Sequence, residues 1–243
     1  MQSTDIIIFI MEITGTIAFA SSGTMLAIQQ EMDLFGVCVL GVTTAVGGGL
    51  VRDLILGIIP PGMFRSPVYT LVAVGVSILL FIAIYVNQNG NAGIWEKIVI
   101  PRKMKSGGHI PGSRGASFPP EKVAQAYDRI MLIFDAVGLG IFTVVGINTA
   151  VSAGYRQRFL LIFVGVITGV GGGLLRDVMA QVKPYILTRH VYACASLAGA
   201  FVCVLGYPYI GRLGAMLSGA AVVMLIRFLA AHYRWNLPRI RKS

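Results

Sequence analysis

A glycine-rich sequence that occurs twice constrains the fold of this chain more than any other feature. Residues 41–53 read Gly-Val-Thr-Thr-Ala-Val-Gly-Gly-Gly-Leu-Val-Arg-Asp, and residues 165–177 read Gly-Val-Ile-Thr-Gly-Val-Gly-Gly-Gly-Leu-Leu-Arg-Asp. Each copy interrupts an apolar stretch with three consecutive glycines and an Arg-Asp pair. The chain therefore contains an internal repeat, and the repeat carries its most unusual residues.

The apolar composition places this repeat in a membrane. Hydrophobic residues make up 56% of the chain and charged residues 12%, with a mean hydropathy of +0.77. Soluble domains carry about twice that share of charge, so one soluble core cannot bury so many apolar side chains. The net charge of +10 is typical of loops that fix membrane topology and contact anionic headgroups, so we expect no nucleic-acid partner. Cys38, Cys194 and Cys203 lie in apolar segments without metal or disulfide spacing, and we expect packed thiols.

Seven windows have about the 20 apolar residues that a helix needs to cross a bilayer. They cover 5–28, 35–57, 66–86, 127–149, 157–180, 188–206 and 209–231. We expect an all-α membrane protein with a first three-helix repeat (1–86), a basic cytoplasmic loop (87–126), a second three-helix repeat (127–206), a seventh transmembrane helix (207–232) and a basic cytoplasmic tail (233–243). No Lys or Arg precedes Arg52, so the first window should be retained as a span.

The similarity between the two copies extends along the spans and predicts an inverted repeat. Glu12, Gly15, Phe19, Gly23 and Ala27 match Asp135, Gly138, Phe142, Gly146 and Ala150, and Pro60 matches Pro184. Because each copy has three spans, an odd number, the copies cross the membrane in opposite directions, as in many transporters. Most basic loop residues then face inward if the N-terminus is outside and the C-terminus cytoplasmic. We expect the 87–126 loop to lie on the surface, with a short interfacial helix near Ile94–Ile100 and possible contacts to anionic headgroups.

The glycines predict kinked or unwound backbone in the second and fifth helices, since glycine has low helix propensity. The expected positions are Gly47, Gly48, Gly49, Gly171, Gly172 and Gly173. Irregular backbone at membrane depth persists beside protein or a water-filled cavity, and its carbonyls could replace part of a cation's hydration shell. The alternative is that the glycines allow close helix packing. Thr44 and Thr168 could line the same path or bond to their own helix backbone.

Charged residues inside the spans need partners, because a charge in the hydrocarbon layer costs about 2.5–3.5 kcal/mol or more. Matching depth predicts ion pairs of Glu12 with Arg52 and of Asp135 with Arg176, acting either as gates or as structural bridges. Asp53 and Asp177 are then expected to keep unneutralised charge that attracts a cation. The sequence contains no dinucleotide fingerprint, P-loop or catalytic triad. The spacing of His109, His190 and His232 does not match that of metal ligands. We therefore expect no enzyme, no cofactor and no metal beyond a transported cation.

The duplicated Gly-Gly-Gly-Leu-Val/Leu-Arg-Asp motif and the three-plus-three-plus-one layout resemble the trimeric intracellular cation (TRIC) channel family, specifically its prokaryotic branch. The resemblance implies a homotrimer with a potassium-permeable pore inside each protomer, lined at the kinks of the second and fifth spans. Animal members differ after the glycines, so their gating by voltage and calcium is not transferred. Related bacterial sequences are often labelled glycine transporters.

Two functions fit these observations. The first is a monovalent cation channel, potassium-permeable, in the plasma membrane of a prokaryote. The second is a secondary transporter for glycine or another small solute, with a midplane site that alternates access. A membrane scaffold is the third reading, although duplicated intramembrane charges seldom serve packing alone.

Overall fold

The computed structural model describes residues 3–89, 121–184, 191–233 and 235, and every regular element in these ranges is a helix. The first repeat contains α1 (Ser3–Gln29), α2 (Leu34–Ile55) and α4 (Val68–Asn89), with the short α3 (Gly62–Arg65) between α2 and α4. The second contains α6 (Glu121–Ser152), α7 (Arg158–Met179) and the first part of α9 (Tyr192–His232). The expected all-α membrane fold is confirmed.

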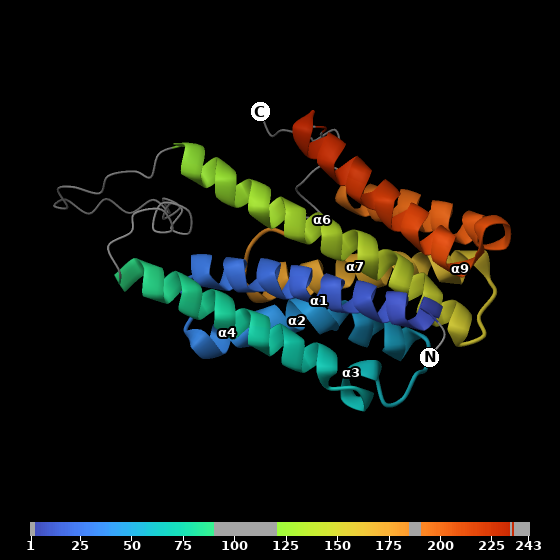
Figure 1. Cartoon of the computed structure of the whole chain (residues 1–243), viewed down its shortest axis with the longest axis horizontal. Coiled ribbons are helices and arrows are strands. Elements are labelled where there is room, and N and C mark those ends of the chain that lie inside the picture. Colours follow the sequence, from blue (N-terminus) through green and yellow to red (C-terminus); the bar gives the residue numbers. More distant parts are fainter. Residues whose placement is uncertain (1–2, 90–120, 185–190, 234, 236–243) are drawn as a thin grey trace, which may run out of the picture.

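Six helices are long and apolar enough to cross a membrane, and the last of them, α9, contains two spans. Its backbone leaves the helical region at Gly211, with φ 71° and ψ 176°. Pro208, just before this break, lacks the N–H that would continue the helical hydrogen bonds. Figure 1 shows the two arms of α9 folded back on each other and joined at one end of the bundle. The second arm, 212–232, is the seventh span.

The two repeats meet where α2 and α7 cross at their glycines. A Cβ on Gly48 would lie 2.2 Å from the backbone oxygen of Thr168, and a Cβ on Gly172 would lie 2.2 Å from the backbone oxygen of Thr44. Only glycine leaves room for backbones this close. We expected kinked or unwound backbone at the glycines; both helices continue through them, so the backbone is not unwound there. These two glycines instead serve close packing, which was the alternative interpretation.

Buried hydroxyl groups connect the first and third helix of each repeat. Thr24 of α1 donates to Ser77 of α4 at 2.9 Å, and Thr143 of α6 and Ser196 of α9 share a hydrogen bond of 2.7 Å. Such bonds link helices in a medium without water. Each repeat is therefore a three-helix unit, in which α4 packs on α1 and α2, and α9 packs on α6 and α7.

Helix boundaries differ from the apolar windows mainly where polar residues extend a helix. α6 begins at Glu121, within the range expected to be loop, because a hydropathy window marks only the apolar part of a longer helix. The interfacial helix expected near Ile94–Ile100, most of the 87–126 loop, the 236–243 part of the tail, His109 and His190 lie outside the described residues.

The crossing predicts a large difference between two glycine-to-alanine substitutions. Gly48→Ala should destabilise the protein by about 1–3 kcal/mol, because the new methyl overlaps the backbone of α7. Gly75→Ala in α4 is the matched control, since nothing lies within 4 Å of its added Cβ, and it should be neutral or slightly stabilising. Thermal unfolding in detergent measures both. Equal melting temperatures for the two variants would contradict the crossing.

Candidate functional site

The charged residues inside the bundle form two clusters, one in each repeat. The first half-site consists of Glu12 from α1, Arg52 and Asp53 from α2, and Tyr69 from α4. The second half-site consists of the equivalent residues from α6, α7 and α9: Asp135, Arg176, Asp177 and Tyr192. Each half-site thus takes an acid, an Arg-Asp pair and a tyrosine from successive helices of its repeat.

Both carboxylate oxygens of Asp53, in the first half-site, accept hydrogen bonds. Arg52 Nε donates to Asp53 Oδ1 at 2.8 Å, and the backbone N–H of Gly62 donates to Asp53 Oδ2 at 2.7 Å. The Asp53 side chain is buried. The expectation that Asp53 keeps unneutralised charge is therefore wrong, because its neighbour in sequence supplies the counter-charge.

Glu12 is held by a tyrosine and not by the arginine that we expected. The hydroxyl of Tyr69 donates to Glu12 Oε2 in a short hydrogen bond. Among the described residues, Arg52 forms its ion pair with Asp53, so the expected pair of Glu12 with Arg52 is absent from this arrangement. Glu12 and Arg52 nevertheless border the same pocket.

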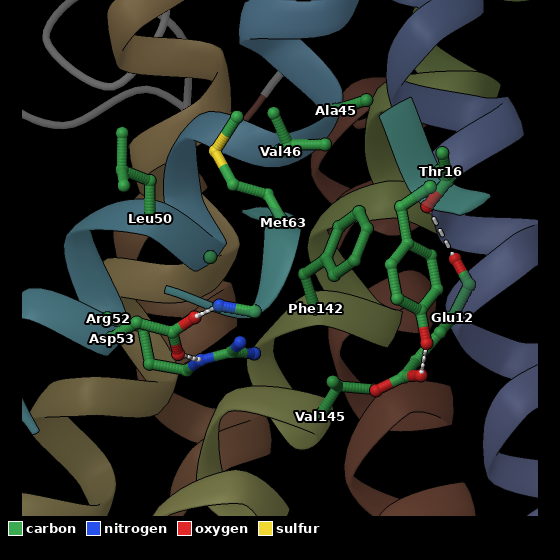
Figure 2. Close-up of a pocket in the computed structure, with 13 residues that line it drawn as sticks. Glu12, Thr16, Ala45, Val46, Leu50, Arg52, Asp53, Met63, Phe142 and Val145 are labelled. Carbon is green, nitrogen blue, oxygen red and sulfur yellow. Dashed lines mark hydrogen bonds and ion pairs between the residues drawn. The ribbon is translucent and has the colours of Figure 1, made fainter. Parts of the chain in front are cut away.

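This pocket has a volume of about 70 Å³ and lies between α1, α2, α3, α4 and α6. Figure 2 shows Arg52 and Asp53 on one side of it and Glu12 and Thr16 on the other. A cavity needs about 10–15 Å³ of such volume to hold one water, so this one has room for several waters or a partly hydrated ion. Gly49 also lines the pocket, and only the tip of Arg52 lies within 4 Å of a Cβ added there.

The second half-site brings the same residue types into direct contact. Arg176 Nε donates to Asp177 Oδ1 at 2.8 Å, and its Nη1 donates to Asp135 Oδ1 at 3.2 Å. The predicted contact of Asp135 with Arg176 is therefore present, and Asp177 is neutralised in the same way as Asp53. The Tyr192 hydroxyl donates to Asp135 Oδ1 at 3.2 Å. The Arg176 side chain is fully buried, whereas Arg52 keeps 14% of its surface exposed.

Two residues outside the repeat comparison complete the second half-site. Arg176 Nη1 donates a short hydrogen bond to the Ser22 hydroxyl of α1. Arg227, from the second arm of α9, donates to Asp135 Oδ2 at 3.3 Å, and its guanidinium carbon lies 4.6 Å from the centre of the Tyr192 ring. Asp135 thus faces two buried arginines.

The candidate pore-lining threonines bond to their own helices. Thr44 donates to the backbone oxygen of Leu40 and Thr168 to that of Val164, both at 2.6 Å, and both threonines are buried. The glycines of the two motifs have different surroundings. Gly48, Gly171 and Gly172 lie at the crossing, and Gly49 borders the pocket. A Cβ on Gly173 would lie 3.1 Å from the Tyr192 hydroxyl. Gly47 packs against Leu175, whose Cδ1 would lie 2.7 Å from an added Cβ.

Four residues of the half-sites were not predicted from the sequence. Tyr69 and Tyr192 occupy matching positions of the two repeats, so carrying the repeat comparison into the third span would have found them. Arg227 is an ionisable residue inside an apolar window, which is itself a signal of a functional position. Ser22 gave no signal, because serine is common in membrane helices.

The two acids at equivalent positions should differ in their importance for stability. Asp135→Asn should cost about 3–5 kcal/mol, because it removes the counter-charge of two buried arginines. Glu12→Gln should cost about 1 kcal/mol or less, since the amide oxygen can still accept from Tyr69. Thermal unfolding in detergent compares them, with Asp5→Asn as the control for an exposed ion pair with Arg212. A larger loss for Glu12→Gln would contradict the assigned contacts.

Comparisons with known proteins agree with this architecture. The sequence model of a family described as Glycine transporter matches residues 9–85 and again 132–208. The UPF0126 inner membrane protein YadS of Escherichia coli K12 is 33% identical over 234 residues, which cover 96% of this chain and 95% of YadS. A UPF0126 membrane protein of Deinococcus radiodurans is 31% identical over 230 residues, covering 94% of this chain and 89% of that protein.

Solved structures show the same fold along almost the whole chain. The crystal structure of a prokaryotic TRIC channel in 0.5 M KCl matches with a TM-score of 0.74 at 29% identity, covering 96% of this chain and 99% of that one. The TRIC orthologue from Rhodobacter sphaeroides matches with a TM-score of 0.74 at 28% identity, covering 94% and 99%. With one family matching both repeats and this fold shared throughout, the chain belongs to the Glycine transporter family and is a multi-pass membrane protein with the fold of the TRIC channels.

Proposed function

We propose that this protein is a passive channel for monovalent cations, permeable to potassium, in the plasma membrane of a prokaryote. The observation that carries the proposal is the pocket beside Glu12, which places a carboxylate and room for a partly hydrated ion inside the span. The similarity to TRIC cation channels, which covers 96% of this chain, supports it. Channels carry out no covalent chemistry, so the protein is not an enzyme.

The path runs between the half-sites, along helices from both repeats. Phe142 and Val145 of α6 line the pocket of the first half-site, and Ser22 of α1 contacts Arg176 in the second. Each half-site is thus completed by the first helix of the other repeat. α1, α2, α6 and α7 therefore line the proposed path.

Cation selectivity follows from the charges that remain available along this path. Asp53 compensates Arg52 locally, so the carboxylate of Glu12 supplies the negative potential that attracts a cation. Gly49 leaves space in the pocket, because a Cβ added there would already lie 3.7 Å from Arg52 Nη2. The second half-site is filled by its own side chains, and conduction requires the contacts of Arg176 with Asp135 to separate.

The proposed assembly is a homotrimer with one path in each protomer. The apolar side chains exposed on α4 and α9, such as Leu71, Leu79, Phe201 and Leu225, provide surface for lipid and for neighbouring copies. The N-terminus outside and the C-terminus in the cytoplasm agree with the distribution of basic residues. Anionic headgroups at the basic 87–126 loop complete the proposed partners.

A transporter for glycine or another small solute is the second candidate, favoured by one observation. Arg52 and Glu12 lie on opposite sides of the pocket, which suits the carboxylate and the ammonium group of a small amino acid. The two candidates differ in coupling, because a channel conducts potassium without a second solute, whereas a transporter shows saturable uptake.

Purified protein in liposomes separates the candidates. We expect potassium flux driven by a membrane potential, and no saturable uptake of labelled glycine under a sodium or proton gradient. Saturable glycine uptake without uncoupled potassium flux would reject the channel and support the transporter.

Glu12→Gln should lower the potassium flux several-fold, because it removes the carboxylate that attracts the cation while keeping the bond to Tyr69. Glu31→Gln, which neutralises an exposed acid in the turn after α1, is the control and should keep the flux of the unmodified protein. Flux assays at equal amounts of reconstituted protein measure both. Equal flux for the unmodified protein and Glu12→Gln would exclude the proposed role.

A further inference from the structure

The two half-sites contain equivalent residues in two different arrangements. In the first, the ion pair of the arginine that the described residues show is with the following aspartate, the acid of α1 is held by tyrosine, and both line a pocket. In the second, Arg176 contacts both Asp177 and Asp135, and its side chain is fully buried. Since the repeats provide the same acid, Arg-Asp pair and tyrosine, the difference must come from residues outside these four positions.

Two side chains distinguish the second half-site from the first. Ser22 accepts a hydrogen bond from Arg176, whereas the matching position in the other repeat is Val145, which lines the first pocket and has no polar side-chain atom. Arg227 comes from the seventh span, which lies outside the repeated sequence. Serine alone offers Arg176 one neutral acceptor, while Arg227 changes the charge of the whole cluster.

The charge balance shows what Arg227 does. Without it, the second half-site would hold one guanidinium, Arg176, beside two carboxylates, Asp135 and Asp177, as the first half-site holds Arg52 beside Glu12 and Asp53. Arg227 adds a second guanidinium, which donates to Oδ2 of Asp135, whereas Arg176 Nη1 donates to Oδ1. It also lies against the ring of Tyr192, an arrangement that stabilises a buried cation. Among the described residues, the second half-site thereby holds two guanidinium groups beside two carboxylates.

We propose that Arg227 is a latch that holds the second half-site closed, and that the first half-site shows the open arrangement of the same residues. This inference rests on the proposed path, because it assigns the closed end of that path to the second arm of α9. A shift of this arm that withdraws Arg227 leaves Asp135 with excess negative charge, which draws water and a cation into the half-site. Arg227 acts through Asp135, and is a positioning residue that need not contact the permeating ion.

Cysteine accessibility at two matched glycines tests the latch. Gly49 and Gly173 are equivalent, but an added Cβ would lie at ordinary contact distance, 3.7 Å from Arg52 Nη2, at Gly49 and only 3.1 Å from the Tyr192 hydroxyl at Gly173. In a background with Cys38, Cys194 and Cys203 replaced, Gly49→Cys should react with a small cationic thiol reagent and Gly173→Cys should not. Adding Arg227→Gln should raise the reaction rate at Gly173→Cys at least tenfold, whereas Arg227→Lys should preserve its protection.

Folding and transport are measured separately from accessibility. Ser22→Cys, close in size to serine, reports on the same half-site if Gly173→Cys does not fold, and Arg227→Met replaces Arg227→Gln if the glutamine variant does not. Each variant is accepted only as a monodisperse protein in detergent. Reactivity of Gly173→Cys or Ser22→Cys with Arg227 in place, or unchanged protection after its replacement, would overturn the latch.

Potassium flux in liposomes is the second measurement that tests the latch. Arg227→Gln should raise the flux several-fold, and the Gly49→Cys rate should stay unchanged. If accessibility follows Arg227 but no variant conducts potassium, the latch stands and the channel proposal fails. If flux is present but accessibility does not depend on Arg227, the channel proposal stands and the latch fails.

Discussion

The backbone contact between α2 and α7 is the constraint on which the rest of the structure depends. Gly48 and Gly172 let the two helices approach until each lies against a backbone oxygen of the other. In a membrane, where lipid is as apolar as the side chains, such close packing is a main source of helix association. The contact fixes the depth of both Arg-Asp pairs, because each pair follows its glycines by only a few residues along a continuous helix.

The second constraint on the structure is that its buried charges must be neutralised. A guanidinium away from water is tolerated only with a counter-charge and hydrogen-bond acceptors, and the adjacent aspartate supplies both in each repeat. This local compensation leaves the acids of the first helices, Glu12 and Asp135, with a separate role. Glu12 borders an open pocket, whereas Asp135 closes a cluster of side chains.

The difference between the half-sites shows how an inverted repeat becomes asymmetric. The seventh span packs against α6 of the second repeat and brings Arg227 to Asp135. An alternating transporter needs both ends of its path to interconvert, whereas a channel needs only one end to be regulated. One half-site held by an extra helix therefore agrees better with a gated channel.

The sequence alone determined the membrane class, the inverted three-helix repeats and the seventh span, because apolar length and the matching of Glu12 with Asp135 are visible along one dimension. It also predicted the contact of Asp135 with Arg176. It failed for Asp53 and for the pair of Glu12 with Arg52, because the rotamer of an arginine depends on which acceptors surround it. Whether a glycine run packs or unwinds, which acid meets an arginine, and that Arg227 reaches Asp135 were decided by the tertiary structure. These outcomes depend on distances between helices that are far apart in the sequence, and the local amino-acid composition does not determine those distances.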